Sequence, residues 1–192
     1  ANFYDQQGIC HVVLPERGHL SPGMFCVGGD SHSPTGGAFG AYMFGIGATE
    51  MAGVLATGEI WLRVPETILI QWDNSLSDYV TAKDMMLAVC GEIGMGGGRY
   101  QAIQYSGMGI QDLSMQERMT MSNMAAELGA QVGLIAPDQV TAEYVAAAGG
   151  QLADDGWDDR IDTADRPEDH LRFDAAALSP QIAAPHSPAN AA

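Results

Sequence analysis

Residues 28–37 read GGDSHSPTGG, and this stretch organises the interpretation of the whole chain. An apolar run, residues 24–27, leads into the paired glycines. An acid, a hydroxyl and an imidazole then follow on consecutive positions: Asp30, Ser31 and His32. A strand that ends in a polar turn and continues into a helix is how open α/β sheets present chemistry. The stretch therefore predicts a functional turn, and an ordinary turn with a capping Asp or Ser is the alternative.

The overall composition limits the classes of protein to which the chain can belong. The 192 residues suffice for one large or two small domains, and 46% of them are hydrophobic. With 24 acidic and only 8 basic residues, the formal net charge is −16, which argues against a nucleic-acid-binding surface. No apolar run reaches the roughly 20 residues of a membrane span. We therefore expect a globular protein with neither nucleic-acid nor membrane partners.

The cysteines indicate the cellular compartment and bear on metal binding. Cys10, Cys26 and Cys90 are widely spaced and form no CxxC pair, which predicts neither a zinc site nor a disulfide framework. Free thiols favour the cytoplasm or an organelle matrix. The chain starts without Met and its last residues are rich in Pro and Ala. We expect both ends to be internal to a longer protein.

Turn residues and capping patterns divide the chain into alternating strands and helices. Residues 8–14 are typical of a helix end or a short strand. Apolar runs predict strands at 62–64, 67–72, 102–105 and 134–136. Helices are predicted at 36–58 with a break near 45–47, at 85–93, at 114–128 and at 141–148, two of them opened by capping boxes. The alternation predicts a three-layer α/β/α fold with a mainly parallel sheet.

The same pattern suggests a domain organisation, with a boundary at Pro65. Residues 1–64 are predicted to form the C-terminal part of a first α/β subdomain, which carries the turn described above. Residues 65–150 form a second α/β subdomain. Residues 151–192 are poor in apolar residues and rich in acids, Pro and Ala, which is typical of a solvated linker and tail.

Two carboxylates and two imidazoles are the candidates for acid–base chemistry. Glu127 follows Asn123 by four residues, so both share one helix face among apolar neighbours, and a carboxylate there needs a partner. His11 and His32 both lie beside turn glycines. A carboxylate that holds an imidazole fixes its tautomer and makes it a usable acid or base. The residues alone do not decide how Asp30 and Glu127 pair with the histidines, and a surface amide and acid remain the alternative on the helix.

Several motifs in register resemble the aconitase superfamily. Residues 29–40, GDSHSPTGGAFG, resemble its GDSH turn, and residues 123–130, NMAAELGA, resemble its NM-x-x-E-x-GA helix. Three further segments fall in the family's order: GICH at 8–11, TAKD at 81–84 and LIAPD at 134–138. Residues 38–40, AFG, and the TAKD segment most resemble the isopropylmalate dehydratase branch of the family, whereas Pro34 and Gly37 favour aconitase itself. The resemblance covers about residues 8–149, and residues 178–188 resemble the lead-in to the family's cluster domain.

The resemblance implies a hydro-lyase or isomerase that acts on hydroxylated di- or tricarboxylic acids at a [4Fe-4S] cluster. One iron of that cluster would have an open position and act as a Lewis acid. The family's motifs also imply roles for six residues. His11 with Asp30, and His32 with Glu127, would be two imidazole–carboxylate pairs, the second of which steers the hydroxyl or water. Ser31 would lie at the substrate and Asn123 near the cluster.

The sequence also departs from the family's pattern. The three cluster cysteines of the family have no counterpart at Cys10, Cys26 or Cys90, and its substrate-clamping arginines and serine base are missing. We therefore expect the parent protein to carry the cluster and this chain alone to bind none and to be inactive. The implied partners are the remaining large-subunit domains and a small swivelling subunit or domain. A non-catalytic α/β module that binds a carboxylate or a partner is the alternative, and an adventitious divalent ion on the four acid–base residues is a further one.

Overall fold

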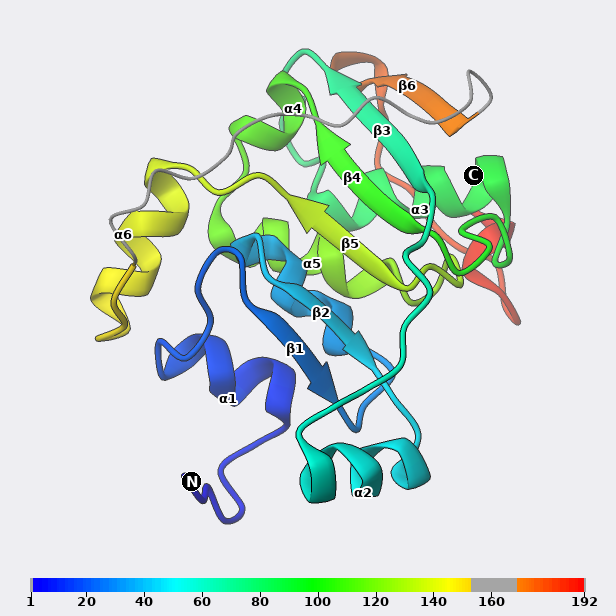
Figure 1. The fold of residues 1–192 in the computed structure, drawn as a ribbon. Coiled ribbons are helices and arrows are strands. Elements are labelled where there is room, and N and C mark those ends of the chain that lie inside the picture. Colours follow the sequence, from blue (N-terminus) through cyan, green and yellow to red (C-terminus); the bar gives the residue numbers. More distant parts are fainter. Residues whose placement is uncertain (1, 153–168, 192) are drawn as a thin grey trace.

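All strands of the computed structural model belong to two parallel sheets, and the model describes residues 2–152 and 169–191 (Figure 1). The smaller sheet pairs β1 (Phe25–Gly28) with β2 (Tyr42–Gly45). The larger sheet has the order β5-β4-β3-β6. Its strands are β3 (Thr67–Asp73), β4 (Ala102–Ser106), β5 (Val132–Ile135) and β6 (His170–Asp174). Each strand pairing is parallel, which confirms the predicted α/β class with its mainly parallel strands.

Within the described residues, six α-helices accompany these strands. They are α1 (Cys10–Glu16), α2 (Ala48–Thr57), α3 (Ala82–Ile93), α4 (Met108–Gln111), α5 (Met115–Met124) and α6 (Gln139–Ala147). Two of them, α3 and α5, pack on one face of the larger sheet. Short 3₁₀ helices occur at η1 (Ser33–Phe39), η3 (Ala175–Ala177) and η4 (Pro188–Asn190). Parallel neighbours need a crossover connection, and α3 and α5 supply the crossovers from β3 to β4 and from β4 to β5. Figure 1 shows both helices behind the sheet. No helix within residues 2–152 and 169–191 has the length and apolarity to cross a bilayer.

Both predicted capping boxes are present. The carboxylate of Asp84 accepts hydrogen bonds from the backbone N–H and the hydroxyl of Thr81, each at 2.7 Å. The carboxylate of Glu117 accepts in the same way from Ser114, at 3.0 and 2.7 Å. Such bonds occupy backbone groups that a helix start leaves without partners. Helix α5 ends at Met124 rather than at Leu128 as predicted, because the next three backbone N–H groups bond to carbonyls three residues back instead of four.

The predicted helix at 36–58 is wrong in its first half. The structure places η1, then β2, and only then α2 in that stretch. Gly40 takes φ +70° after η1, a conformation that favours glycine and ends the helical turn. The aromatic residues Tyr42 and Phe44 of β2 then pack with Phe25 of β1, with ring centroids 5.6–5.9 Å apart. Side chains of this kind favour a strand.

Two further predictions about strands differ from the structure. Residues 62–64 are irregular, because no strand within residues 2–152 and 169–191 pairs with the segment that connects the two sheets, whereas β3 begins at Thr67 as predicted. In the region predicted as linker and tail, β6 pairs with β3 and stacks Phe173 on Trp72, with centroids 4.6 Å apart. Residues 153–168 of that region lie outside the described residues. The domain boundary at Pro65 falls in the connecting segment and remains a prediction.

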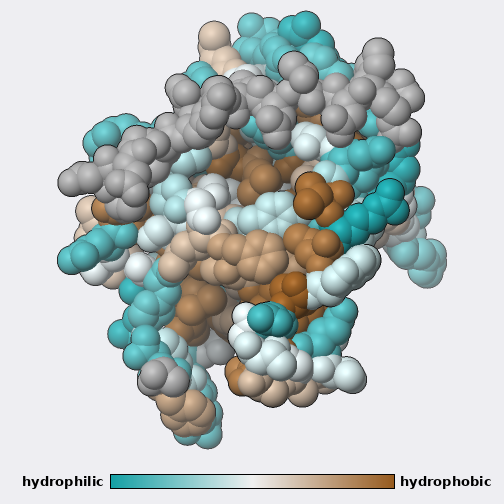
Figure 2. Space-filling model, viewed as in Figure 1, coloured by the Kyte–Doolittle hydropathy of each residue, from teal (hydrophilic) through white to brown (hydrophobic). Residues whose placement is uncertain are grey.

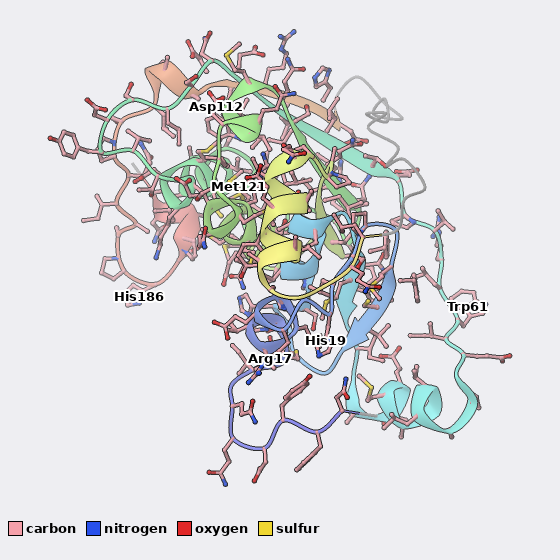
Figure 3. The ribbon with its side chains drawn as sticks, turned by 90° about the vertical axis from the view of Figure 1, so that its left-hand side faces the viewer. Arg17, His19, Trp61, Asp112, Met121 and His186 are labelled. Atoms are coloured by element: carbon pink, nitrogen blue, oxygen red, sulfur yellow. The ribbon has the colours of Figure 1, made fainter. Side chains whose placement is uncertain are left out.

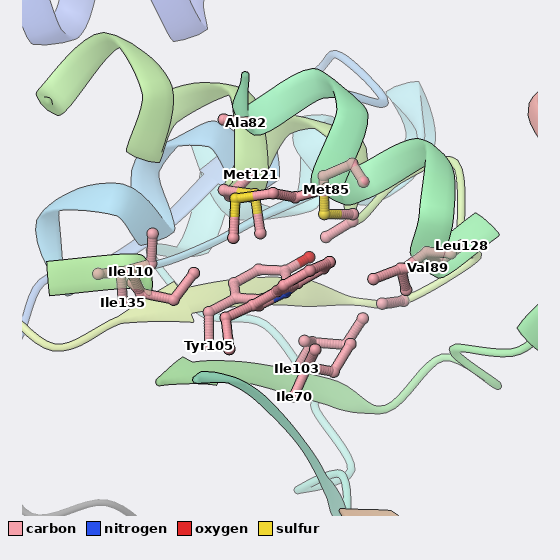
Figure 4. Packing of buried hydrophobic residues seen from close by; sticks show 14 of the residues in the cluster. Ile70, Ala82, Met85, Val89, Ile103, Tyr105, Ile110, Met121, Leu128 and Ile135 are labelled. Atoms are coloured by element: carbon pink, nitrogen blue, oxygen red, sulfur yellow. The ribbon is translucent and has the colours of Figure 1, made fainter. Parts of the chain in front are cut away.

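The larger core fills the space between the four-stranded sheet and helices α3 and α5 (Figure 4). Met85 and Val89 of α3 and Met121 of α5 pack there against Ile103 and Tyr105 of β4. All five are fully buried. Burial of a large apolar side chain contributes about 1.5–3 kcal/mol, so this core fixes α5, and with it the end of α5 that bears Asn123, against the sheet.

Helix η1 joins the two sheets and sets the position of the turn before it. Its seven residues are all buried, and it packs against β2, β5 and α5. A Cβ atom on Gly36 would lie 2.7 Å from the sulfur of Met43, and one on Gly37 would overlap the backbone carbonyl of Gly133. The two glycines are therefore required for this close approach. Through it, the turn at residues 30–32 is held beside the end of α5.

Some apolar side chains remain exposed on the connecting segment and the smaller sheet. Trp61 is 88% exposed and extends outward from the segment between α2 and β3 (Figure 3). Phe25 and Val64 are also exposed, and they line one shallow apolar hollow. Figure 2 shows apolar surface gathered across the middle of this face of the molecule. Apolar surface of this kind is typical of a contact with other protein segments.

Candidate active site

The turn after β1 is held by hydrogen bonds among its own residues. The Oδ1 atom of Asp30 accepts a hydrogen bond from the backbone N–H of His32 at 2.7 Å. The Ser33 hydroxyl donates to the carbonyl of Asp30, and the Thr35 hydroxyl donates to the carbonyl of His32, each at 2.7 Å. A side chain that bonds its own backbone two residues on is the Asx-turn pattern. The positions of the Asp30 carboxylate and the His32 backbone are thus fixed locally.

The first imidazole–carboxylate contact joins α1 to this turn. His11, the second residue of α1, is buried, and its Nδ1 lies 3.3 Å from Oδ1 of Asp30. The two atoms are not aligned as a hydrogen bond, and Nδ1 has no hydrogen-bond partner among the described residues. Burial lowers the pKa of His11 below 6.5; the Asp30 carboxylate opposes this change and the neighbouring His32 adds to it. His11 is therefore a neutral imidazole at neutral pH.

The second contact joins the turn to the segment after α5. The Nε2 atom of His32 lies 3.4 Å from Oε1 of Glu127, and each side chain is about one third exposed. On the other side of the ring, the hydroxyl of Ser31 lies 3.1 Å from Nδ1 of His32. Contacts at both nitrogens fix the orientation of the ring. His32 is therefore oriented and partly open to solvent, whereas His11 is buried.

Asn123 reaches the same turn from helix α5. Its Nδ2 donates a hydrogen bond to the Thr35 hydroxyl at 3.0 Å, and that hydroxyl in turn donates to the carbonyl of His32. Thr35 is not one of the six site residues predicted from the sequence. Its place in the turn is the one feature of the sequence that could have indicated this role, since short hydroxyl side chains often form hydrogen bonds with nearby backbone groups. Thr35 thus links α5 to the backbone of His32.

All six predicted residues come together in the structure. The rings of His11 and His32 have centroids 6.1 Å apart, and Asp30 lies within 4 Å of both histidines. The distances pair His11 with Asp30 and His32 with Glu127, as the resemblance implies. Ser31 contacts His32, and Asn123 reaches the same turn through Thr35. The chemical roles of these residues remain predictions.

A cavity of about 480 Å³ adjoins this cluster. His11 and Thr35 form one part of its wall, helix α5 contributes Asn123 and Met124, and Glu16 and Lys83 complete the charged groups. A larger hollow of about 610 Å³ lies beside Trp61 and Arg63, away from the paired acids and imidazoles. The chemistry of the wall, rather than size, makes the cavity at His11 the candidate site.

The three cysteines do not fit an iron–sulfur cluster, which is held by thiolates at a common centre. Cys90 is fully buried in the larger core, and burial, together with the charge of Glu127, raises its pKa to about 11. Burial also raises the pKa of Cys26 in β1. Both groups are thiols rather than thiolates at neutral pH. Within residues 2–152 and 169–191, no three His, Cys, Asp or Glu side chains are grouped so that they could hold a metal ion.

Comparison with known proteins gives one consistent result. The model of the aconitase family (aconitate hydratase) matches residues 2–192. The 3-isopropylmalate dehydratase large subunit 1 of Methanopyrus kandleri is 46% identical over 190 residues, which is 98% of this chain and 45% of that protein. The probable methanogen homoaconitase large subunit of Methanothermobacter thermautotrophicus is 42% identical over 186 residues, 95% of this chain and 42% of that protein. The chain thus spans less than half the length of these curated relatives.

Proposed function

The chain belongs to the aconitase family, and we propose that it is part of a hydro-lyase that dehydrates and rehydrates hydroxylated di- or tricarboxylic acids. The names of its relatives, dehydratases and homoaconitases, support this reaction class. The observation that carries the proposal is the convergence of two imidazole–carboxylate pairs, whose rings lie 6.1 Å apart and of which one member, His11, lines the cavity. The relatives are named large subunits, so a small subunit is the expected partner of the whole protein.

The reaction defines what these residues must do. Dehydration of a hydroxy acid breaks a C–O bond and the neighbouring C–H bond, forms a C=C bond and releases water. The hydroxyl leaves as water only when it gains a proton, and a base takes the proton from carbon. We assign the first task to His32. Its imidazole, whose Nε2 lies 3.4 Å from the Glu127 carboxylate, would carry a proton to the leaving hydroxyl and take it back in hydration, and Glu127 would stabilise the protonated ring.

The other pair has a different environment and therefore a different role. His11 is buried and neutral because burial lowers its pKa. A neutral imidazole beside Asp30 would hold a hydrogen bond to the substrate without competing for the proton of His32. Ser31, an exposed hydroxyl next to His32, would bind the substrate. The base that removes the carbon-bound proton is proposed to come from the rest of the parent protein.

The cluster that the family implies would likewise be held outside these 192 residues, since the thiols described above do not fit it. We therefore propose that the chain alone turns over no substrate. The alternative, a non-catalytic α/β module that binds a carboxylate or a partner, makes a different prediction for the whole protein. Under that alternative the parent protein, assembled with its partner and assayed for hydration of small unsaturated diacids, would show no turnover at all.

Substitutions in the whole protein test the proposed roles. His32→Gln and Glu127→Gln should each lower kcat by about 10²- to 10⁴-fold, the usual contribution of a positioned acid or base. His186→Asn, at an exposed histidine of the C-terminal segment with φ +86°, is the control and should leave kcat unchanged. Full activity of the His32→Gln protein would overturn the assignment.

A further inference from the structure

Resting on the function proposed above, we propose that Lys83 binds a carboxylate group of the substrate in the cavity that His11, Thr35 and Asn123 also line. Lys83 is the sole lysine of the sequence. It lies in the first turn of α3, is exposed, and lines the same cavity as His11, Thr35 and Asn123. Among the residues that line this cavity it is the one Lys or Arg side chain.

The first turn of α3 is rigid, so Lys83 is presented at a defined place. The carboxylate of the next residue, Asp84, accepts two hydrogen bonds from Thr81 on one oxygen and a 2.7 Å hydrogen bond from the backbone N–H of Gln181 on the other. Helix α3 also packs on α5, the helix that carries Asn123. The start of α3 is thus fixed to both neighbours, so the backbone of Lys83 is held in place and only its side chain has to become ordered when a ligand binds.

Lys83 itself has no use in the fold of the described residues. Within residues 2–152 and 169–191 it makes no hydrogen bond or ion pair that the structure shows, and the carboxylate of the adjacent Asp84 is engaged with Thr81 and Gln181. A cation in the first turn of a helix is disfavoured by the helix dipole. An anion bound beside Lys83 would offset this unfavourable interaction with the dipole.

The charges of the cavity wall also give the ligand a direction. Glu16, at the end of α1, lines the cavity as well, and it would repel a carboxylate that Lys83 attracts. A hydroxylated di- or tricarboxylate carries at least two negative charges, and the chain as a whole carries −16. The carboxylate remote from the reacting carbons therefore belongs at Lys83, while the hydroxyl end lies toward the histidines.

Kinetics of the whole protein, assembled with its partner, test this assignment. Lys83→Gln should raise KM for the hydroxy acid by about 10- to 100-fold, the range for a hydrogen bond to a charged group, with kcat within about threefold. Lys83→Arg should restore most of the loss. Added salt should raise KM of the unaltered protein more than that of the Gln variant. Arg63→Gln removes one positive charge at the other hollow and should leave KM unchanged.

A direct binding measurement tests the role of Lys83 without requiring turnover of a substrate. Tricarballylate, a tricarboxylate that lacks the hydroxyl, is titrated calorimetrically into the same proteins. Weaker binding to the Lys83→Gln protein alone supports the proposal, even if no substrate turns over and the proposed function fails. A KM and a tricarballylate affinity that are unchanged in Lys83→Gln, or equally changed in Arg63→Gln, would overturn it while leaving the hydro-lyase function intact.

Discussion

Gly37 of η1 and Gly133 of β5 pack backbone against backbone, so that a Cβ atom on Gly37 would overlap the carbonyl oxygen of Gly133. This contact joins the buried helix η1 to the four-stranded sheet. Backbone atoms in a strand cannot move aside as a flexible side chain can. The relationship between these two glycines therefore sets how closely the turn with Asp30 and His32 approaches the end of α5.

Gly37→Ala should consequently destabilise the chain by at least about 2 kcal/mol, the cost of forcing an extra methyl group into a packed interior. Urea unfolding followed by circular dichroism measures this change. Gly53→Ala is the matched control, because Gly53 lies in helix α2 and its added Cβ would meet no atom within 4 Å. That variant should gain about 0.5–1 kcal/mol from helix propensity. Equal stabilities of the two variants would contradict the close contact.

Arg118 supplies a second test of the fold. It is 1% exposed, and its guanidinium donates to both oxygens of Asp138 at 2.7 Å and to the carbonyls of Gln111 and Leu113. Arg118→Ala leaves these acceptors without their partner and should cost about 3–5 kcal/mol. Arg172→Ala breaks an exposed ion pair with Asp73 and should cost less than about 1 kcal/mol. Equal losses of unfolding free energy in Arg118→Ala and Arg172→Ala would contradict this prediction.

The buried position of His11 makes its titration a reporter of the site. Burial lowers its pKa, the Asp30 carboxylate raises it and His32 lowers it. Asp30→Asn should therefore lower the pKa of His11 further, and His32→Gln should raise it. Imidazole proton shifts in NMR spectra measure both changes. An unchanged pKa of His11 in the Asp30→Asn protein would show that the Asp30 carboxylate, 3.3 Å away, does not affect this pKa.

The lowered pKa of His11 also predicts how the free energy of unfolding depends on pH. The unfolded chain binds a proton at His11 near pH 6.5, whereas the folded chain does so only at lower pH. Between these two values the unfolded state holds more protons, so this contribution to stability is lost as the pH falls below about 6.5. In His11→Gln, unfolding curves measured from pH 7 to pH 5 should lose that part of the dependence. An identical pH dependence in the variant would contradict the prediction.

Anaerobic reconstitution with iron and sulfide tests the expectation about the cluster. The chain alone should retain no stoichiometric [4Fe-4S] cluster, because the thiols of Cys26, which is partly buried, and Cys90, which is buried, have raised pKa values and cluster irons need thiolates. Visible absorption and iron counting provide the measurement. A cluster that is retained, and that disappears on replacing Cys10, Cys26 and Cys90 by Ser, would prove this expectation wrong.

Local patterns predicted much of the fold, and long-range pairing explains most of what they missed. The capping boxes at Thr81 and Ser114 were readable because each depends on residues three positions apart. The strand β6 was not, because its partner β3 lies about a hundred residues earlier and its own residues are partly exposed. The helix predicted over β2 failed for the same reason, since Tyr42 is in a strand only through its pairing with Phe25.

The candidate site, like the fold, could be predicted only in part from the sequence. The residue types and turn glycines identified His11, His32 and the two carboxylates, but spacing in the sequence contains no information on which imidazole meets which acid. The motifs of the family implied that pairing, and the distances agree with it. The role of Thr35 could not be predicted from its own position, because it depends on a hydrogen bond from Asn123, which lies 88 positions later in the chain.

The distance in sequence between His32 and Glu127, 95 positions, constrains how genes for such proteins can exchange segments. One member of the pair lies before the segment that connects the two sheets and the other lies after it. A hybrid gene joined within residues 58–66 would take the turn from one parent and the end of α5 from the other. Gly37 with Gly133 and Thr35 with Asn123 would then have to match across the junction as well. We expect functional hybrids only where both parents share all of these partners.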